Sequence, residues 1–301
     1  MNYKILDDMK TTNIKKVNYS ITSVLYTLFS VLFISCSEQE IEPVGSMKDT
    51  PITIASAGVA ELTTRVITDD NKLVGTSDSH ATMSVFVTGG TEAKYNATNL
   101  KWEHNGTSWD SKTNVFFEGA SSTQKIYAYS PFFFDSTSSI AVNASEQTDW
   151  LVATATDITS SVVNLTMTHA LTKLVLKPTF GTELTSQTIT SVKVEGMYAS
   201  GTLNVFDNTW SNLPEANTIL AMANNELLVI PMASCTSLPI TITMEDARVF
   251  KTTINLATVE NMLEAGVQYN LHIQVGQDKV TLGEITASPW GYAAGGVLET
   301  E

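Results

Sequence analysis

Alternation of apolar and polar residues with a period of two restricts the fold of this chain more than any other feature. In "LPITITM" (238–244), the residues Leu238, Ile240, Ile242 and Met244 fall on one face, and a proline and threonines fall on the other. Successive side chains of a strand point to opposite faces, so this period predicts half-buried strands. Five further runs are of the same kind: "ATMSVFV" (81–87), "KIYAYSP" (125–131), "VVNLTMTHAL" (162–171), "KLVLKP" (173–178) and "YNLHIQV" (269–275).

Turn-forming residues separate these runs, as in Gly89-Gly90, Asn105-Gly106 and Gly181. Short strands spaced by such turns are typical of antiparallel β-sandwiches, so we expect an all-β fold. The best helical signal is "NLATVENMLEAGVQY" (255–269), whose apolar residues lie at helical spacing and whose glycine, Gly266, stands where a C-terminal cap would be. This segment predicts a short helix or turn.

The N-terminal segment combines a basic stretch with an apolar run that ends at a cysteine. The run from Ile21 to Ser35 has 15 residues, whereas a membrane-spanning helix needs about 20. Lys10, Lys15 and Lys16 precede it, as in a secretory signal peptide. Translation could start at Met1 or at Met9. The segment predicts secretion, with residues 1–35 removed.

The end of this run, Phe33-Ile34-Ser35-Cys36, resembles the lipobox of bacterial lipoproteins. The resemblance implies that Cys36 carries diacylglycerol and becomes the first mature residue, which would tether the protein to the outer membrane. Phe33 departs from the more usual aliphatic residue. The alternative is an ordinary signal peptide followed by an unmodified cysteine. The acidic segment 36–50 is either a solvated tether or, as in surface lipoproteins of the Bacteroidota that it resembles, a signal for export to the cell surface.

Composition limits the partners and the domain organisation. Removal of residues 1–35 takes away four of the 17 basic and two of the 31 acidic residues, which leaves a net charge of −16. Such a chain repels phosphate backbones, so we expect no nucleic-acid partner. If Cys36 is lipidated, Cys235 has no disulfide partner. The length predicts two domains, which we place at residues 51–160 and 161–301.

Chemical motifs are scarce. The four histidines, at positions 80, 104, 169 and 272, lie far apart in sequence and have no cysteine or carboxylate at metal-ligand spacing. His169 and His272 fall in predicted strands, where a hydrogen-bonded structural role is the more common one. The sequence contains no nucleophile elbow, P-loop, zinc-protease or dinucleotide-binding motif. We therefore predict no enzyme activity, no catalytic residue, no metal site and no cofactor.

Several motifs, taken in order, resemble the fimbrillin family, the lipoprotein pilins of Bacteroidales. After the lipobox comes "ITIASAGVAELTTRV" (52–66), in which Thr64-Arg65 resembles the threonine-arginine processing motif of the family. "YAYSP" (127–131) is similar to its aromatic strand, and "DWLVATATDITSSVVNLTMTHALTKLVL" (149–176) to its histidine-alanine-leucine junction. "LEAGVQYNLHIQV" (263–275) and "EITASPW" (284–290) match its C-terminal pattern. Val66 and Thr172 depart from the family's usual alanine and serine.

Membership in this family implies two transthyretin-like antiparallel β-sandwiches in series and no catalysis. It also implies assembly with other fimbrial subunits, as a homopolymer or a heteropolymer, by strand exchange. In that process the N-terminal strand first fills a groove in its own domain, a protease cuts after an arginine, and a strand from a neighbouring subunit takes its place. The expected function is a stalk or accessory tip subunit of a fimbria that supports adhesion. No receptor is indicated.

The resemblance assigns roles to particular residues. The sequence has two arginines, Arg65 and Arg248, and Arg65 lies in a polar stretch near the N-terminal end. Arg65 is therefore the candidate cleavage site. The alternative is that it is an ordinary solvated arginine. The candidate donor is the C-terminus, "PWGYAAGGVLETE", in which Trp290, Tyr292 and Leu298 share one face of an extended chain and would be its anchors. The alternative is that this tail forms the last strand of its own domain.

A second function also fits the sequence: a monomeric surface lipoprotein that binds glycans or proteins. Trp102, Trp109 and Trp150 could stack on sugar rings if they were exposed, although tryptophans in a sandwich more often fill the core. A third function, a surface hydrolase, lacks a recognisable nucleophile or a pair of carboxylates.

Overall fold

The computed structural model describes residues 47–59, 73, 81–134, 138–184 and 186–290. All of them belong to one compact unit, Gly45–Glu301. Cys36, Arg65, Tyr292 and Leu298 lie outside the described residues. Strands dominate the described chain, and its helical residues are confined to three single 3-10 turns, at Ala93–Tyr95 (η1), Ala144–Glu146 (η2) and Ala257–Val259 (η3). The prediction of an all-β fold is confirmed.

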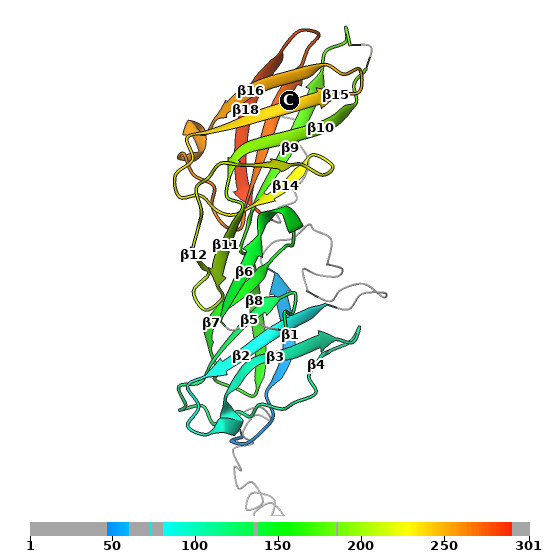
Figure 1. The fold of residues 1–301 in the computed structure, drawn as a ribbon. Coiled ribbons are helices and arrows are strands. Elements are labelled where there is room, and N and C mark those ends of the chain that lie inside the picture. The colour runs from blue at the N-terminus through cyan, green and yellow to red at the C-terminus, as the bar shows by residue number, and fades with distance from the viewer. Residues whose placement is uncertain (1–46, 60–72, 74–80, 135–137, 185, 291–301) are drawn as a thin grey trace, which may run out of the picture. The chain divides into compact units, whose positions relative to one another are not determined.

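The larger sheet has seven strands and is labelled in Figure 1. Its spatial order is β1-β8-β7-β5-β2-β3-β4. The strands are β1 (Thr53–Val59), β2 (Thr82–Thr88), β3 (Ala97–His104), β4 (Trp109–Asp110), β5 (Lys125–Ser130), β7 (Leu151–Asp157) and β8 (Val162–His169). The edge strands β1 and β4 also lie close to each other, so the sheet curls around its own core.

Three smaller sheets complete the described chain. The first has the order β12-β11-β6, the second β13-β10-β15-β16 and the third β14-β9-β17-β18. Their bounds are β6 (Ser139–Asn143), β9 (Thr172–Phe180), β10 (Ile189–Met197), β11 (Ser200–Asn204), β12 (Thr209–Ser211), β13 (Thr218–Ala221), β14 (Glu226–Val229), β15 (Ser237–Met244), β16 (Val249–Asn255), β17 (Val267–Val275) and β18 (Val280–Pro289).

All six runs of period two form strands, as predicted. In β15, the four residues predicted to share a face are each at most 2% exposed. Most neighbouring strands are antiparallel, but β1 pairs in parallel with β8, and β9 pairs in parallel with β17. A parallel pair needs a long crossover connection, so its two strands come from distant parts of the chain.

Between β16 and β17, the segment predicted as a short helix or turn forms a turn and a loop. The structure has the 3-10 turn η3 at Ala257–Val259, and Leu263 then pairs with Met232 in a β-bridge. Glu260 and Asn261 both adopt positive φ angles, 61° and 56°. Two consecutive left-handed residues end a helical turn, and the apolar residues that followed a helical spacing pack instead as a loop.

Two hydrophobic clusters fill the described chain. The first lies inside the curled seven-stranded sheet and includes Val85, Ile126 and Leu165. The second continues through the smaller sheets but also includes Phe86 and Tyr129 from β2 and β5. Neighbouring residues of these two strands thus belong to different clusters, because the middle of the sheet is covered on both faces. The five central residues of β2 are therefore all buried, although the alternation in the sequence predicted a half-buried strand.

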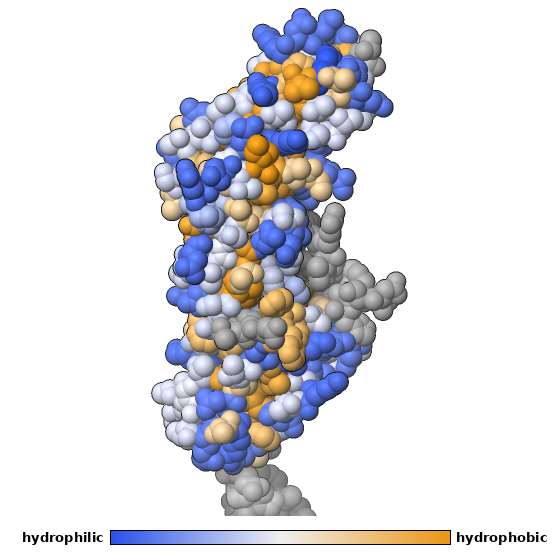
Figure 2. Space-filling view, in the orientation of Figure 1, coloured by the Kyte–Doolittle hydropathy of each residue, from blue (hydrophilic) through white to orange (hydrophobic). Residues whose placement is uncertain are grey.

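The predicted boundary between residues 160 and 161 stays a prediction. Strand β6, from the first predicted domain, pairs with β11, from the second, and the second cluster draws residues from both. In the view of Figure 2, several groups of hydrophobic residues lie among hydrophilic ones. None of the helices among the described residues is long and apolar enough to cross a membrane.

Candidate assembly site

Among the described strands, the N-terminal strand β1 has one ladder neighbour in the seven-stranded sheet, β8. The parallel ladder runs from Thr53, opposite Val162, to Val59, opposite Met167. One face of β1 enters the first hydrophobic cluster, where Ile54, Ala57 and Val59 are each at most 3% exposed. The other residues of the strand are exposed or half-buried. β1 is therefore an edge strand whose apolar face completes a core that the rest of the sheet builds.

An irregularity in β1 sets which residues enter this core. The ladder shifts between Ile54 and Ser56, so Ala55 is an extra residue in the strand. Before the shift the even-numbered Ile52 and Ile54 are buried, and after it the odd-numbered Ala57 and Val59 are buried. A bulge of one residue reverses the alternation, and here it allows both halves of the strand to face the core.

The chain that leads into β1 is fastened by hydrogen bonds to the segment 115–117. The amide of Asp49 donates to the carbonyl of Phe117 at 2.8 Å, and the amide of Phe117 donates to the carbonyl of Thr50 at 2.8 Å. The amide of Ile52 donates to the carbonyl of Val115, also at 2.8 Å. These bonds extend the contacts of the N-terminal strand beyond its ladder with β8.

Side chains add an ionic clamp at the same place. The Asp49 carboxylate accepts a hydrogen bond from the Tyr95 hydroxyl at 2.7 Å and lies 2.8 Å from the Lys94 ammonium. Lys94 and, after it, Tyr95 hold the pKa of Asp49 below its usual value, and Asp49 raises the pKa of Lys94. Asp49 has a φ of 66°, which aspartate tolerates better than most residues. Because both charged groups are about half exposed, the ion pair alone stabilises only weakly.

On the other side of β1, its backbone has a second contact. The amide of Leu73 donates to the carbonyl of Ala57 at 2.9 Å, and Leu73 is fully buried in the same cluster. In sequence, the candidate cleavage site Arg65 therefore falls between β1 and the buried Leu73. The candidate lipid site Cys36 lies on the other side of β1, so the strand belongs to the portion of chain between lipid and cleavage site.

Trp290, a predicted donor anchor, lies directly after β18 and is buried in its own chain, with 1% of its surface exposed. Its amide donates to the carbonyl of Gly266 at 2.6 Å. Its ring stacks on that of His169, with ring centroids 3.7 Å apart, and the Lys173 ammonium lies 5.9 Å from it. Because the side chain is fixed here, Trp290 marks the base of the C-terminal tail.

Most of the histidines and tryptophans that the structure describes are buried. His169 is buried and hydrogen-bonds Asp149 at 2.8 Å, as expected of a structural histidine, whereas His272 is exposed. Trp102, Trp109 and Trp150 are each at most 7% exposed, so they fill the core and provide no platform for a sugar. Among the residues that the structure describes, no three His, Cys, Asp or Glu side chains gather as a metal site would require.

Sequence reasoning missed the clamp of Asp49, Lys94 and Tyr95. Asp49 lies more than 40 residues before the other two members, and a single sequence has no signal for an ion pair between distant segments. It also missed the exposed aromatic residues of the segment 132–134, although their composition could have been noticed: three consecutive phenylalanines follow a predicted strand and precede an aspartate.

The fold is shared with candidate cell adhesion proteins and with a fimbrial protein of solved structure. A candidate cell adhesion protein from Bacteroides ovatus superposes with a TM-score of 0.62 at 18% identity, over 81% of this chain and 99% of that one. Another candidate cell adhesion protein, from Bacteroides uniformis, superposes with a TM-score of 0.56 at 20% identity, over 69% of this chain and 91% of that one. The tip fimbrial protein Mfa3 from Porphyromonas gingivalis, truncated at its C-terminus, superposes with a TM-score of 0.51 at 9% identity, over 80% of this chain and 100% of that one. At these identities the likeness concerns the fold alone.

The sequence itself matches the family described as fimbrillin-like over residues 64–290. Because this match covers most of the chain, the protein belongs to the fimbrillin-like family. This is a family of fimbrial structural proteins and not of enzymes, and membership supports a fimbrial subunit at the cell surface. No protein of curated function matches the sequence significantly.

Proposed function

We propose that this protein is a lipoprotein subunit of a fimbria, either of the stalk or of an accessory tip structure, and that it assembles by β-strand exchange after proteolysis. The observation that carries the proposal is the position of β1. This strand is a buried edge of the sheet, and it lies between the proposed lipid on Cys36 and the proposed cleavage site at Arg65. Cleavage there would separate it covalently from the rest of the chain.

Departure of β1 would leave a groove with unpaired backbone groups and an exposed apolar pocket. The backbone groups of β8 that now pair with β1 would lack partners, and an exposed strand edge invites pairing with another chain. The pocket that now holds Ile52, Ile54 and Val59 would face water. Burial of such side chains contributes on the order of 1.5–3 kcal/mol each, so an apolar strand from a neighbouring subunit would bind this groove favourably.

We place the donated strand in the C-terminal tail. Tyr292 and Leu298 would enter the groove of a neighbour, because they share one face of an extended chain and follow the end of β18. Trp290 is buried in the core of its own subunit. As an anchor it would therefore fix the start of the donated tail and would not enter the neighbour's groove. The same cleavage would release the subunit from its lipid and therefore couple release to assembly. In this role the protein has no catalytic function.

Substitution of the candidate cleavage site tests the proposal directly. Arg65→Ala should leave the chain folded but prevent polymer formation, because β1 would remain covalently attached and could reoccupy its groove. Unboiled samples treated with an arginine-specific protease, which does not cut after the nearby Lys72, are compared by gel electrophoresis, where polymers appear as a ladder. Lys72→Ala, in the same polar stretch, is the matched control and should give a normal ladder. A normal ladder from Arg65→Ala would refute the processing role.

A further inference from the structure

An irregularity in β3 fixes an exposed aromatic loop. Between Ala97 and Leu100 the pairing of β3 with β2 shifts, and Asn99 adopts a φ of 50°. Bulges redirect side chains, and the Asn99 amide nitrogen here donates to the carbonyls of Phe133 and Phe134, at 3.0 and 2.9 Å. The buried Tyr129 also donates, from its hydroxyl, to the Phe133 carbonyl at 3.2 Å.

Hydrogen bonds to its carbonyl groups thus hold the backbone of this loop, while the rings of Phe133 and Phe134 face solvent. Phe133 is 50% exposed and Phe134 is 82% exposed. Exposure of two adjacent phenylalanines is unfavourable in water, and side-chain hydrogen bonds to their carbonyls keep them in place. Exposed aromatic groups that the fold itself supports are typical of binding surfaces.

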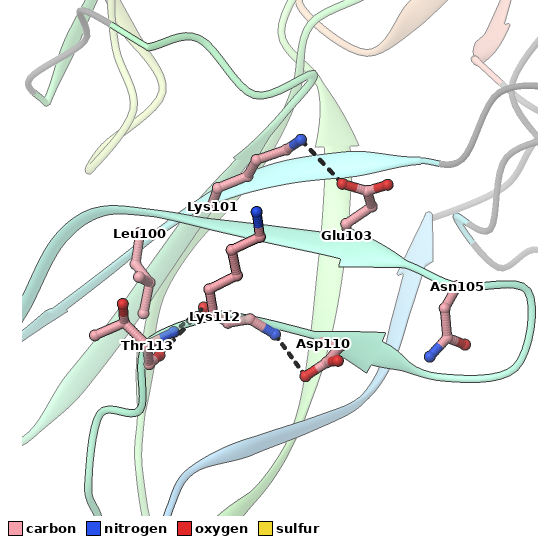
Figure 3. A pocket seen from close by; sticks show the side chains of 8 residues that line it. Leu100, Lys101, Glu103, Asn105, Asp110, Lys112 and Thr113 are labelled. Carbon is pink, nitrogen blue, oxygen red and sulfur yellow. Dashed lines mark hydrogen bonds and ion pairs between the residues drawn. The ribbon is translucent and has the colours of Figure 1, made fainter.

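A cavity of about 560 Å³, lined mostly by polar and charged residue types, lies along the same strand. Figure 3 shows its lining, which comes from β3, from β4, from the turn between them and from the turn after β4. The Lys101 ammonium and the Glu103 carboxylate form an ion pair at 2.9 Å, and no dashed line joins the Lys112 ammonium to another lining residue. Both donors and acceptors line it: Lys101, Glu103, Asn105, Asp110, Ser111, Lys112 and Thr113, with Leu100 as an apolar member.

The aromatic loop and the cavity adjoin each other. Asn99, which holds the loop, directly precedes Leu100 and Lys101, which line the cavity. The Lys101 ammonium also lies 5.8 Å from the centre of the Phe132 ring. We call the combined area, made of residues 99–105, 110–113 and 132–134, the β3 surface.

We propose that the β3 surface binds an oligosaccharide. A sugar ring has an apolar face of C–H groups and a rim of hydroxyls, and each hydroxyl both donates and accepts hydrogen bonds. The exposed phenylalanine rings suit the apolar face. The ammonium groups, the Asn105 amide and the carboxylates of Glu103 and Asp110 suit the hydroxyl rim. The cavity volume lies within the usual range for small-ligand sites, about 300–1,000 Å³.

Other ligand classes fit this surface less well. The protein's formal charge of −14 opposes nucleic acid. Two lysines in the lining oppose a divalent cation. A protein partner could cover the phenylalanines, but a dry interface would also bury the charged groups of Lys101 and Glu103, each 48% exposed, at a cost in desolvation. Sugar hydroxyls offer such groups hydrogen bonds in place of those to water, which offsets this cost.

The proposal does not depend on polymerisation, so its test uses the monomeric full chain. Labelled protein is applied to an array of immobilised mammalian N-linked and O-linked oligosaccharides and bacterial wall polysaccharides. Wild-type protein should bind a subset of these glycans, and the free oligosaccharide should compete. Phe134→Ala and Lys112→Ala should each weaken binding at least tenfold. Both side chains lie outside the core, so circular dichroism spectra and melting temperatures should be unchanged.

Two matched controls remove the same groups elsewhere. Val249→Ala truncates an apolar residue that is 55% exposed, and Lys251→Ala removes an exposed lysine of β16; both should bind like wild type. The proposal is overturned if wild-type protein binds no glycan on the array, or if the two β3-surface variants bind as well as it does. Self-association of the wild-type chain that Phe134→Ala abolishes, without glycan binding, would instead identify a protein interface and overturn it too.

Discussion

Ile54→Ala should loosen the hold of the sheet on its N-terminal strand. Ile54 is 3% exposed and lies in the first half of β1, where the strand has only β8 as a ladder partner among the described strands. Truncation of a buried isoleucine to alanine costs about 2–5 kcal/mol, because apolar contacts are lost and a cavity remains. Since about 1.4 kcal/mol corresponds to a factor of ten, a cleaved N-terminal fragment should bind its groove roughly 30-fold to several thousand-fold more weakly.

The assay follows this fragment after cleavage. Purified full-length chain is cut with an arginine-specific protease, and size-exclusion chromatography with mass spectrometry measures how much fragment remains bound. Arg248, the other arginine, forms an ion pair with Asp246 at 2.7 Å, and the mass of the products shows whether it stays intact. Val162→Ala, on β8 and 49% exposed, is the matched control and should retain the fragment. Equal retention by Ile54→Ala and wild type would refute the inference that burial holds β1 in place.

Two further perturbations test the contacts around the candidate assembly site. The folded pKa of Asp49 is lowered by Lys94 and Tyr95, so its clamp stabilises above the usual aspartate pKa of 3.8 and is lost as the pH falls through the lower folded value. Fragment retention should therefore drop in strong acid, and Asp49→Asn should remove this part of the pH dependence; an unchanged profile in the variant would contradict the assignment. Trp290→Ala should lower the free energy of unfolding by about 3–5 kcal/mol and the melting temperature by roughly 6–20 °C. Circular dichroism measures the melting temperature, Phe134→Ala should melt like wild type, and an unshifted transition in Trp290→Ala would show that the stacked ring contributes little.

The strands were predictable because their signal is local. In β15, for example, the alternation of Ile240 and Ile242 with threonines is enough to define both the strand and its buried face. The parallel pairing of β1 with β8 was not predictable, since more than 100 residues separate the partners and nothing in either strand specifies the other. The family resemblance supplied the idea of a displaceable N-terminal strand, and the structure shows that β1 is an edge strand with a buried face.

The candidate site was less accessible to sequence reasoning than the fold. Asp49 and Lys94 are common surface residues, and their pairing arises only because β1 enters the sheet beside η1. Trp290 was expected in a donor segment, yet its position against His169 depends on the packing of β17 and β18, which a pattern of alternating residues does not specify. Cys36 and Arg65 were named from local motifs and stay predictions.

The extra residue in β1 also limits which strands could replace it. A segment with strict alternation can direct its large side chains into only one half of the space that β1 fills, because the core-facing positions change from even to odd within the strand. A competitor must either carry a similar irregularity or leave half of that space poorly packed. For the proposed C-terminal donor, an irregularity at Gly295-Gly296 would meet this requirement between Tyr292 and Leu298. The extra residue Ala55 thereby makes the groove selective, because otherwise similar hydrophobic segments without such an irregularity would fit it less well.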